Sequence, residues 1–318
     1  MRALVTRLAG GGRREKVLVA DWPEPDRPVG NQVKTQTVYS GVTNGSERND
    51  LVGGNYANKD EALPAGWGYQ NVGRVVACGP DVQLLKVGDL LFMSKGHLEY
   101  VVVPEDGLLV KLPPSVDATH AALFGISSVA MRICRHADLR LGERVLIVGA
   151  GLLGQVAAQV AAAMGASVSI CDIDEKRLGM ARSIGAAEGA YDVTGAGWDQ
   201  HVGEGCFDAV IDAAGVPDQE DKLISAVRRL GRVLFIAGRF RLSYTFNIGN
   251  ELEVTIKQSR HFDRRDLADT CRLVAQGRVR IGPLIQDVVP VTDANRIYEL
   301  LRDAPAALFG TVFTWSKG

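Results

Sequence analysis

The feature that most constrains this chain is a set of three glycines at fixed spacing, Gly149, Gly151 and Gly154. It follows the apolar stretch 144–148, which reads as a buried strand, and it opens the apolar stretch 155–164, which reads as a helix. In that context the pattern G-x-G-x-x-G predicts a dinucleotide site, because the glycines permit a tight turn, close approach of a pyrophosphate and close helix–strand packing. The alternative is a tight strand–helix turn that binds no ligand.

An acid at the expected distance supports the dinucleotide interpretation. Asp172 follows the strand expected at 167–171 and lies 172 − 151 = 21 residues after the second glycine, near the ~20 typical of the acid that binds the ribose 2′-hydroxyl. A carboxylate there repels a 2′-phosphate, so the sequence favours NAD over NADP. Asp174 is a rival for this role, and Lys176 and Arg177 would soften the preference.

The order of elements predicts a two-part α/β chain. Residues 1–110 read as mostly β, with a long loop at 43–64, and the chain after about residue 255 reads as helix, strand, helix and strand. Between them helices and buried strands alternate, which predicts a doubly wound parallel sheet. The expected helices are 117–135, 155–164, 175–184 and 218–229, and the expected strands are 144–148, 167–171, 207–211 and 232–237.

Composition excludes several classes of protein. The 318 residues suggest about two domains. Lys and Arg number 36 against 37 Asp and Glu, so no basic excess points to nucleic acid or to a membrane surface. The five cysteines include no Cys-x-x-Cys, which argues against a disulfide framework and favours the cytoplasm. No apolar stretch is long and unbroken enough to cross a bilayer.

Several short motifs in a fixed order resemble the medium-chain dehydrogenase/reductase superfamily. They are 73–76 (GRVV), 87–89 (VGD), 99–104 (EYVVVP), 142–149 (GERVLIVG), 212–215 (DAAG), 231–233 (GRV) and 283–285 (PLI). The resemblance implies a GroES-like β domain at 1–120, a Rossmann NAD-binding domain at 121–255 and a C-terminal return to the first domain at 256–318. It also implies a substrate cleft between the domains and a homodimer formed through the sheet edge around 237–246.

Within that superfamily the chain departs from the zinc alcohol dehydrogenases. Thr43 stands where the first zinc cysteine is expected, Gly-His-Glu becomes Gly68-Tyr69-Gln70, and the third ligand position falls near Phe124. These side chains cannot make the site that zinc needs, and no cysteine lies between Cys78 and Cys134 to form the structural zinc lobe. The sequence therefore predicts no zinc.

Two segments resemble the zinc-free bacteriochlorophyllide dehydrogenase-like branch, which contains alcohol-oxidising members. They are 40–47 (SGVTNGSE) and 313–315 (FTW). The reaction type is carried over from that branch, and the chlorin substrate is not. The resemblance also assigns further residues to the cofactor site, besides the glycines and Asp172: Leu152, Leu153, Ser128, Ala213, Ala214 and Gly215.

Without zinc, side chains must supply the acid–base groups and the hydrogen bonds at the substrate oxygen. The resemblance directs attention to Lys95 and His97, to Tyr69, and to the pair Ser46 and Glu47. Each has a plainer alternative. Lys95 would be a solvated loop lysine, His97 a turn residue bonded to backbone, Tyr69 a filler of the space vacated by the metal, and Glu47 a surface loop carboxylate.

These observations together predict a zinc-independent, NAD-dependent oxidoreductase. Its substrate would be a small molecule with a secondary alcohol, such as a polyol, sugar or cyclitol, because the polar 43–71 region suits hydroxyl groups. Three alternatives stay open. They are a redox-neutral epimerase that keeps NAD bound, a zinc-free NADPH enone or quinone reductase, and a non-catalytic NAD-binding protein.

Overall fold

A computed structural model describes residues 1–315 of the chain, which divides into two compact units. Unit 1 comprises Met1–Ile126, Asp263–Ala275 and the chain from Ile281 onward, whereas unit 2 comprises Ser127–Phe262 and Gln276–Arg280. The expected domain boundaries at 120 and 255 lie a few residues before these.

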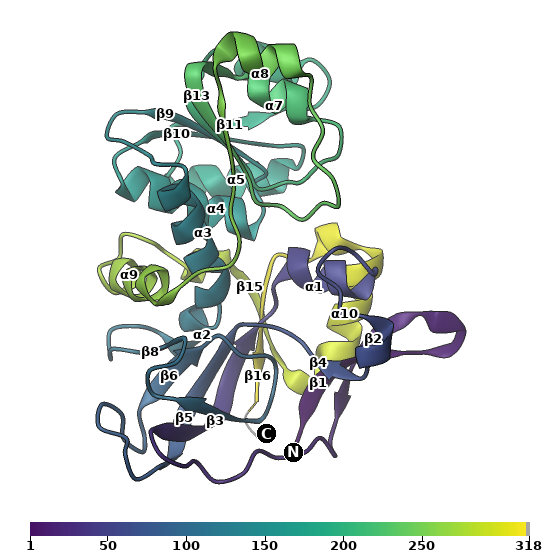
Figure 1. Ribbon diagram of the computed structural model, residues 1–318, viewed down its shortest axis with the longest axis vertical. Coiled ribbons are helices and arrows are strands. Elements are labelled where there is room, and N and C mark those ends of the chain that lie inside the picture. Colours follow the sequence, from purple (N-terminus) through teal and green to yellow (C-terminus); the bar gives the residue numbers. More distant parts are fainter. Residues whose placement is uncertain (316–318) are drawn as a thin grey trace. The chain divides into compact units, whose positions relative to one another are not determined.

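Unit 2 contains a six-stranded parallel sheet in the order β11-β10-β9-β12-β13-β14 (Figure 1). The order reverses between β9 and β12, as in a doubly wound fold, and ligands of such sheets bind beyond the carboxyl ends of the strands at that point. The strands are β9 (Arg144–Val148), β10 (Ser167–Asp172), β11 (Gly189–Asp192), β12 (Phe207–Asp212), β13 (Val227–Phe235) and β14 (Thr255–Gln258).

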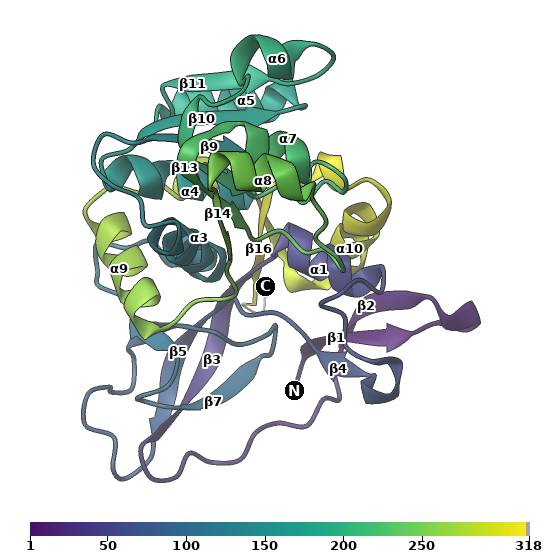
Figure 2. The ribbon, with the colours of Figure 1, turned by 45° about the horizontal axis from the view of Figure 1, so that its top comes forward.

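Helices cover this sheet, and buried apolar residues hold them to it (Figure 2). Leu146, Val210 and Val233 are register neighbours on one face, and they belong to the same apolar cluster as Leu223 and Ile224 of α7. The helices of unit 2 are most of α3 (Phe124–His136), α4 (Leu152–Ala163), α5 (Glu175–Ile184), α6 (Gly197–His201), α7 (Glu220–Ser225) and α8 (Phe246–Leu252).

Unit 1 is built on two sheets. One has the order β2-β1-β4 and the other the order β15-β16-β3-β5-β6-β8, with β7 paired to β3. The strands are β1 (Ala3–Leu8), β2 (Arg14–Val19), β3 (Gln32–Gly41), β4 (Ala65–Gly66), β5 (Asn71–Cys78), β6 (Leu90–Met93), β7 (Tyr100–Pro104), β8 (Leu109–Lys111), β15 (Ile285–Pro290) and β16 (Gly310–Thr314). Its α-helices are α1 (Asn44–Leu51), α2 (Ala118–Ala121), α9 (Arg264–Ala275) and α10 (Ala294–Asp303).

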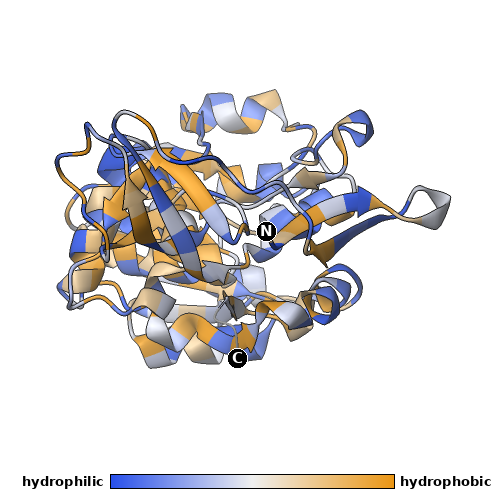
Figure 3. Ribbon diagram, turned by 90° about the horizontal axis from the view of Figure 1, so that it is seen from below, coloured by the Kyte–Doolittle hydropathy of each residue, from blue (hydrophilic) through white to orange (hydrophobic). Residues whose placement is uncertain are grey.

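The C-terminal segment returns to the N-terminal sheet. Strand β16 pairs antiparallel with β3, so residues more than 270 apart in the chain are neighbours, with Phe313 opposite Ser40. Short 3-10 helices complete the structure at Gly10–Gly12, Asp60–Ala62, Gly282–Leu284, Val291–Asp293 and Pro305–Ala307. Figure 3 shows that hydrophobic and hydrophilic residues alternate along many of the same strands and helices. Among the described residues, no helix is long and apolar enough to cross a membrane.

Three sequence-based element assignments are wrong. The expected loop 43–64 contains the helix α1, the expected helix 117–135 is broken between α2 and α3, and the expected helix 218–229 ends at Ser225. In addition, the chain after residue 255 begins with a strand, β14. Leu230 takes φ of 63° inside β13, a conformation that no helix could contain.

Candidate functional site

The glycine turn after β9 has the geometry that a dinucleotide site requires. Gly149 adopts φ of 99°, which favours glycine, and a Cβ on Gly154 would overlap the carbonyl oxygen of Gly149. By contrast, no atom lies within 4 Å of the place where a Cβ on Gly151 would stand. The backbone just before α4 is therefore open to a ligand, and the N–H groups of the first helical turn face it.

Asp172 closes this turn from the end of β10. Its Oδ2 accepts a hydrogen bond from the Ala150 N–H at 2.6 Å, and its Oδ1 accepts one from the Ile173 N–H at 2.7 Å. The rival acid Asp174 caps α5 instead, accepting from the Lys176 N–H at 2.9 Å. Arg177 lies 4.0 Å from Asp172, so a cation stands next to the acid that the sequence assigns to the ribose.

The other residues expected at the cofactor lie around the same edge of the sheet or close to it. The Ala213 N–H donates to the Val148 carbonyl, and the Ala214 and Gly215 N–H groups donate to Asp212. These three donors are thus already used within the chain. Leu152 and Leu153 begin α4, with Leu152 buried, and Ser128 is buried on α3.

At the positions that correspond to zinc ligands, Gln70 and Thr43 are hydrogen-bonded to each other. Gln70 donates from Nε2 to the Thr43 Oγ1 at 2.8 Å, and its Oε1 accepts from the Ile126 N–H at 3.0 Å. Both ends of the amide are therefore used, while Phe124 is buried against Phe92. These residues do not fit a zinc ion. No group of three or more His, Cys, Asp and Glu in residues 1–315 is arranged to hold a metal.

Three hydroxyl groups gather beside that contact. The Tyr69 hydroxyl is hydrogen-bonded to Ser46 and to Thr43. Tyr69 and Ser46 are half-buried, whereas Thr43 is buried. Burial and the charge of Glu47, opposed by these two hydrogen bonds, raise the pKa of Tyr69 to about 12. Tyr69 is consequently a hydrogen-bond donor, and not a base, at neutral pH.

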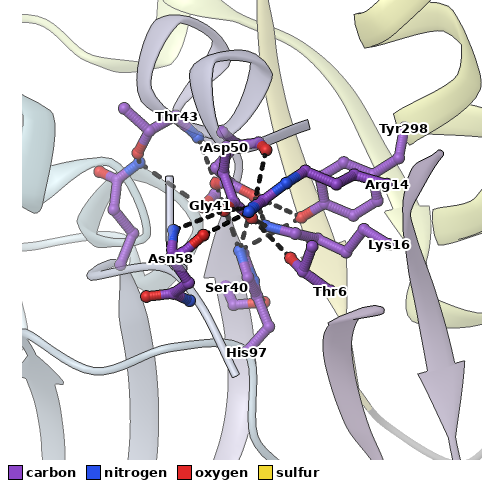
Figure 4. A network of polar contacts seen from close by, with 12 residues as sticks. Thr6, Arg14, Lys16, Ser40, Gly41, Thr43, Asp50, Asn58, His97 and Tyr298 are labelled. Atoms are coloured by element: carbon purple, nitrogen blue, oxygen red, sulfur yellow. Dashed lines mark hydrogen bonds and ion pairs between the residues drawn. The ribbon is translucent and has the colours of Figure 1, made fainter. Parts of the chain in front are cut away.

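Thr43 also belongs to a buried polar network, in which Figure 4 labels Lys16, His97 and Tyr298 and in which all of these residues contact Glu47. Glu47 accepts hydrogen bonds from the Thr43 N–H at 2.7 Å and from the Tyr298 hydroxyl at 2.5 Å. His97 Nε2 is 3.3 Å from both carboxylate oxygens, and Lys16 Nζ is 3.2 Å from Oε2. The alternative that Glu47 is a surface carboxylate is therefore wrong, because its side chain is fully buried.

The partners of His97 indicate where its ring proton lies. Trp315 Nε1, which can only donate, gives its hydrogen to Ser40 Oγ at 2.8 Å. The Ser40 hydroxyl is then free to donate to His97 Nδ1, also at 2.8 Å. This arrangement leaves a proton on Nε2 directed at Glu47. His97 is thus neither a simple turn residue nor accessible to a substrate, since only 1% of its surface is exposed.

The charge of Glu47 is held by its neighbours. Burial alone would raise the pKa of this carboxyl, but the charge of Lys16, followed by His97 and the Tyr298 hydrogen bond, lowers it to about 2. Tyr298 is affected in the opposite direction, since burial and the adjacent Glu47 raise its pKa well above the usual value. Glu47 is therefore a permanent anion at neutral pH.

The remaining candidate, Lys95, is exposed. Sequence reasoning missed Lys16, Ser40 and Tyr298. The only signal for Lys16 was its place on the same strand face as Arg14, two residues earlier, and both are buried on β2. Nothing in the local pattern distinguishes buried cations from solvated ones.

Known proteins share this chain's sequence and fold. A family model for zinc-binding dehydrogenases matches residues 153–276. A probable D-xylulose reductase A from Arthroderma otae is 27% identical, covering 90% of this chain and 91% of its own. The L-threonine 3-dehydrogenase of Streptomyces coelicolor is 30% identical, covering 74% of this chain and 77% of its own.

Among solved structures, an Escherichia coli alcohol dehydrogenase complexed with NADH has a TM-score of 0.85 at 18% identity, covering 99% of both chains. That structure shows the fold alone, and the L-threonine 3-dehydrogenase, at 30% identity, defines the class. The chain belongs to the medium-chain dehydrogenase/reductase superfamily and is an oxidoreductase of the alcohol dehydrogenase type. Its fold class is the mixed α/β arrangement expected from the sequence.

Proposed function

We propose that this protein is a zinc-independent, NAD-dependent oxidoreductase that transfers a hydride between a secondary alcohol of the polyol, sugar or cyclitol class and nicotinamide. The observation that carries the proposal is the Tyr69–Ser46–Thr43 hydroxyl cluster, in which Thr43 and Tyr69 stand where the zinc alcohol dehydrogenases are expected to have zinc ligands. The names of the relatives, D-xylulose reductase and L-threonine 3-dehydrogenase, support a hydroxylated substrate.

The chemistry divides between the units. Unit 2 supplies the coenzyme site at Gly149–Gly154 and Asp172, and bound NAD supplies the hydride acceptor. In unit 1 the half-buried hydroxyls of Tyr69 and Ser46 are the groups that reach the substrate oxygen. As the alcohol loses its hydride, negative charge on that oxygen is stabilised by the Tyr69 O–H, a fixed donor. The alcohol proton leaves through the Ser46 hydroxyl to water.

The test is turnover with a panel of polyols, sugars and cyclitols, measured as NADH absorbance, with NADP in parallel and elemental analysis of the same sample. We expect turnover with NAD that survives dialysis against a strong chelator. Loss of activity on chelation and its return with Zn²⁺ would contradict zinc independence. Tightly retained NAD with interconversion of epimers and no net NADH would instead support the epimerase.

A second copy of the chain is the partner we propose, through the segment after β13. Phe240 and Phe246 are large apolar residues exposed by 83% and 73%, which is unusual for a surface that faces only water. Light scattering on the purified protein tests this proposal, with the variant Phe240→Asp as the disrupted form. A monomeric wild type would contradict it.

A further inference from the structure

Lys16 places a buried positive charge against Glu47. Its side chain on β2 is fully buried, with Nζ 3.2 Å from Glu47 Oε2 and 4.0 Å from Asp50 Oδ2. The ammonium also lies over two aromatic rings, 5.1 Å from the centre of Trp67 and 4.9 Å from that of Tyr298. These faces exclude water and favour a cation, so the attraction between Lys16 and Glu47 is weakly screened.

Glu47 connects Lys16 to the first turn of α1 through hydrogen bonds. Its Oε1 accepts from the Thr43 N–H at 2.7 Å, and its own N–H donates to the Thr43 carbonyl at 2.8 Å. The two bonds close a ring that fixes Thr43 at the start of the helix. Thr43 and Ser46, on either side of that turn, hold the Tyr69 hydroxyl.

Helix α1 is short and buries few side chains that could hold its first turn in place. α1 has only eight residues, and its buried residues are Glu47, Asp50 and Leu51. Leu51 packs into an apolar cluster of unit 1, and ion pairs hold the two acids, from Lys16 to Glu47 and from Arg14 to Asp50 at 3.3 Å. Removal of Lys16 would leave a buried carboxylate without its cation, and the carboxylate then takes up a proton, which weakens its hold on the Thr43 N–H.

We propose that Lys16 is a positioning residue for the alcohol chemistry: acting through Glu47, it fixes the first turn of α1 so that Thr43 and Ser46 hold the Tyr69 hydroxyl for the substrate oxygen. The inference rests on the proposed function, because it assigns Tyr69 to that oxygen. Lys16 touches neither the hydroxyls nor a substrate, and its effect reaches them only through Glu47.

The first experiment is the variant Lys16→Met. We expect kcat/KM to fall at least tenfold with the Kd for NAD, measured by fluorescence, within about twofold of wild type. The pH profile of kcat should gain an ionisation near neutrality, with activity rising toward high pH as Glu47 loses the proton it has acquired. A profile and kcat/KM like those of wild type would overturn the proposal.

A matched control is Arg232→Met. Arg232 and Glu143 form a mostly buried ion pair in unit 2, with side chains exposed by 12% and 11%, against 0% for both Lys16 and Glu47. This variant should lose stability but keep the kcat/KM and pH profile of wild type. If it gains the same ionisation as Lys16→Met, the effect is a general one of ion-pair loss, and the proposal fails.

The double variant Lys16→Met/Glu47→Gln tests whether Lys16 acts through the charge of Glu47. A glutamine still offers an acceptor to the Thr43 N–H and leaves no uncompensated charge, so kcat/KM should return to within about threefold of wild type without the new ionisation. If Lys16→Met does not fold, a folded and active double variant supports the proposal. A double variant no better than the single one overturns it.

An infrared measurement separates this inference from the proposed function, since it needs no turnover. At pH 7 Lys16→Met should show the carbonyl band of a protonated carboxyl group that is absent from wild type and from the double variant. If wild type turns over no alcohol but the band is present, the proposed function fails and the Lys16–Glu47 coupling stands. Absence of the band in folded Lys16→Met, which keeps Glu47 ionised, overturns the coupling.

Discussion

At the scale of the residue, the chemistry of this site depends on hydroxyl groups with fixed partners. Tyr69 is held by Ser46 and Thr43 and stays protonated, with a pKa of about 12. Replacing it with phenylalanine removes the donor and keeps the ring. We expect Tyr69→Phe to lower kcat about 10²–10³-fold, the usual cost of losing one donor at a developing oxyanion, with little change in NAD affinity.

Steady-state kinetics on the alcohol found in the panel would measure this, with Tyr100→Phe as the control. The hydroxyl of Tyr100 on β7 accepts a hydrogen bond from Gln36 Nε2 at an exposed place. Because the pKa of Tyr69 is about 12, the variant should have the same pH profile as wild type between pH 6 and 9. A profile that loses a limb between pH 6 and 9 would show that Tyr69 acts as the base.

Coenzyme choice is a second property set by single residues. Asp172 stands at the end of β10 with Arg177 at 4.0 Å, and Asp174 also lies 3.6 Å from Arg177. Asp172→Asn should weaken NAD binding about tenfold and raise the relative use of NADP, because it removes the repulsion and frees Arg177 for a 2′-phosphate. Titration of both coenzymes measures the ratio. The control variant Asp174→Ala should lose the α5 cap without changing that ratio.

At the scale of the element, two glycines of the turn between β9 and α4 have different roles: Gly154 allows close packing, and Gly151 leaves room for the coenzyme. A Cβ at residue 154 meets the carbonyl oxygen of Gly149, whereas one at residue 151 meets nothing. Gly154→Ala should therefore cost about 1–3 kcal/mol of stability through overpacking. Gly151→Ala should change stability by only about 0.5 kcal/mol and yet reduce NAD affinity at least tenfold. Urea unfolding and NAD titration of both variants distinguish the two effects, and equal stability losses would contradict this division.

Helices α5 and α1 illustrate which elements could be predicted from the sequence and which could not. Helix α5 begins and ends where the sequence placed it, because Asp174 caps it and Gly185 closes it at φ of 69°. Helix α1 was missed because its buried residues are mainly acids, which a hydrophobic pattern cannot detect. The Glu47 network could not be predicted from the sequence either, because residues 16, 47, 97 and 298 come into contact only in the folded chain.

At the scale of the whole molecule, the buried charges make stability depend on pH. The pKa of Glu47 is about 2 in the folded chain and about 4.3 in an unfolded one. Because the folded value is the lower one, this stabilisation is fully present above about pH 5 and is lost as the pH falls toward 2. Asp89, Glu99 and Asp208 add to the loss, because basic partners lower their pKa values against the effect of burial.

The double variant Lys16→Met/Glu47→Gln isolates the contribution of the buried Lys16–Glu47 pair to the pH dependence of stability. Between pH 5 and pH 2.5 its free energy of unfolding should fall less than that of wild type, by about 2 kcal/mol. Urea unfolding at several pH values measures the difference. The pair also costs desolvation, so at pH 7 the variant can equal wild type in stability while differing from it in acid. Parallel curves throughout would mean that Glu47 is not held ionised in the folded chain.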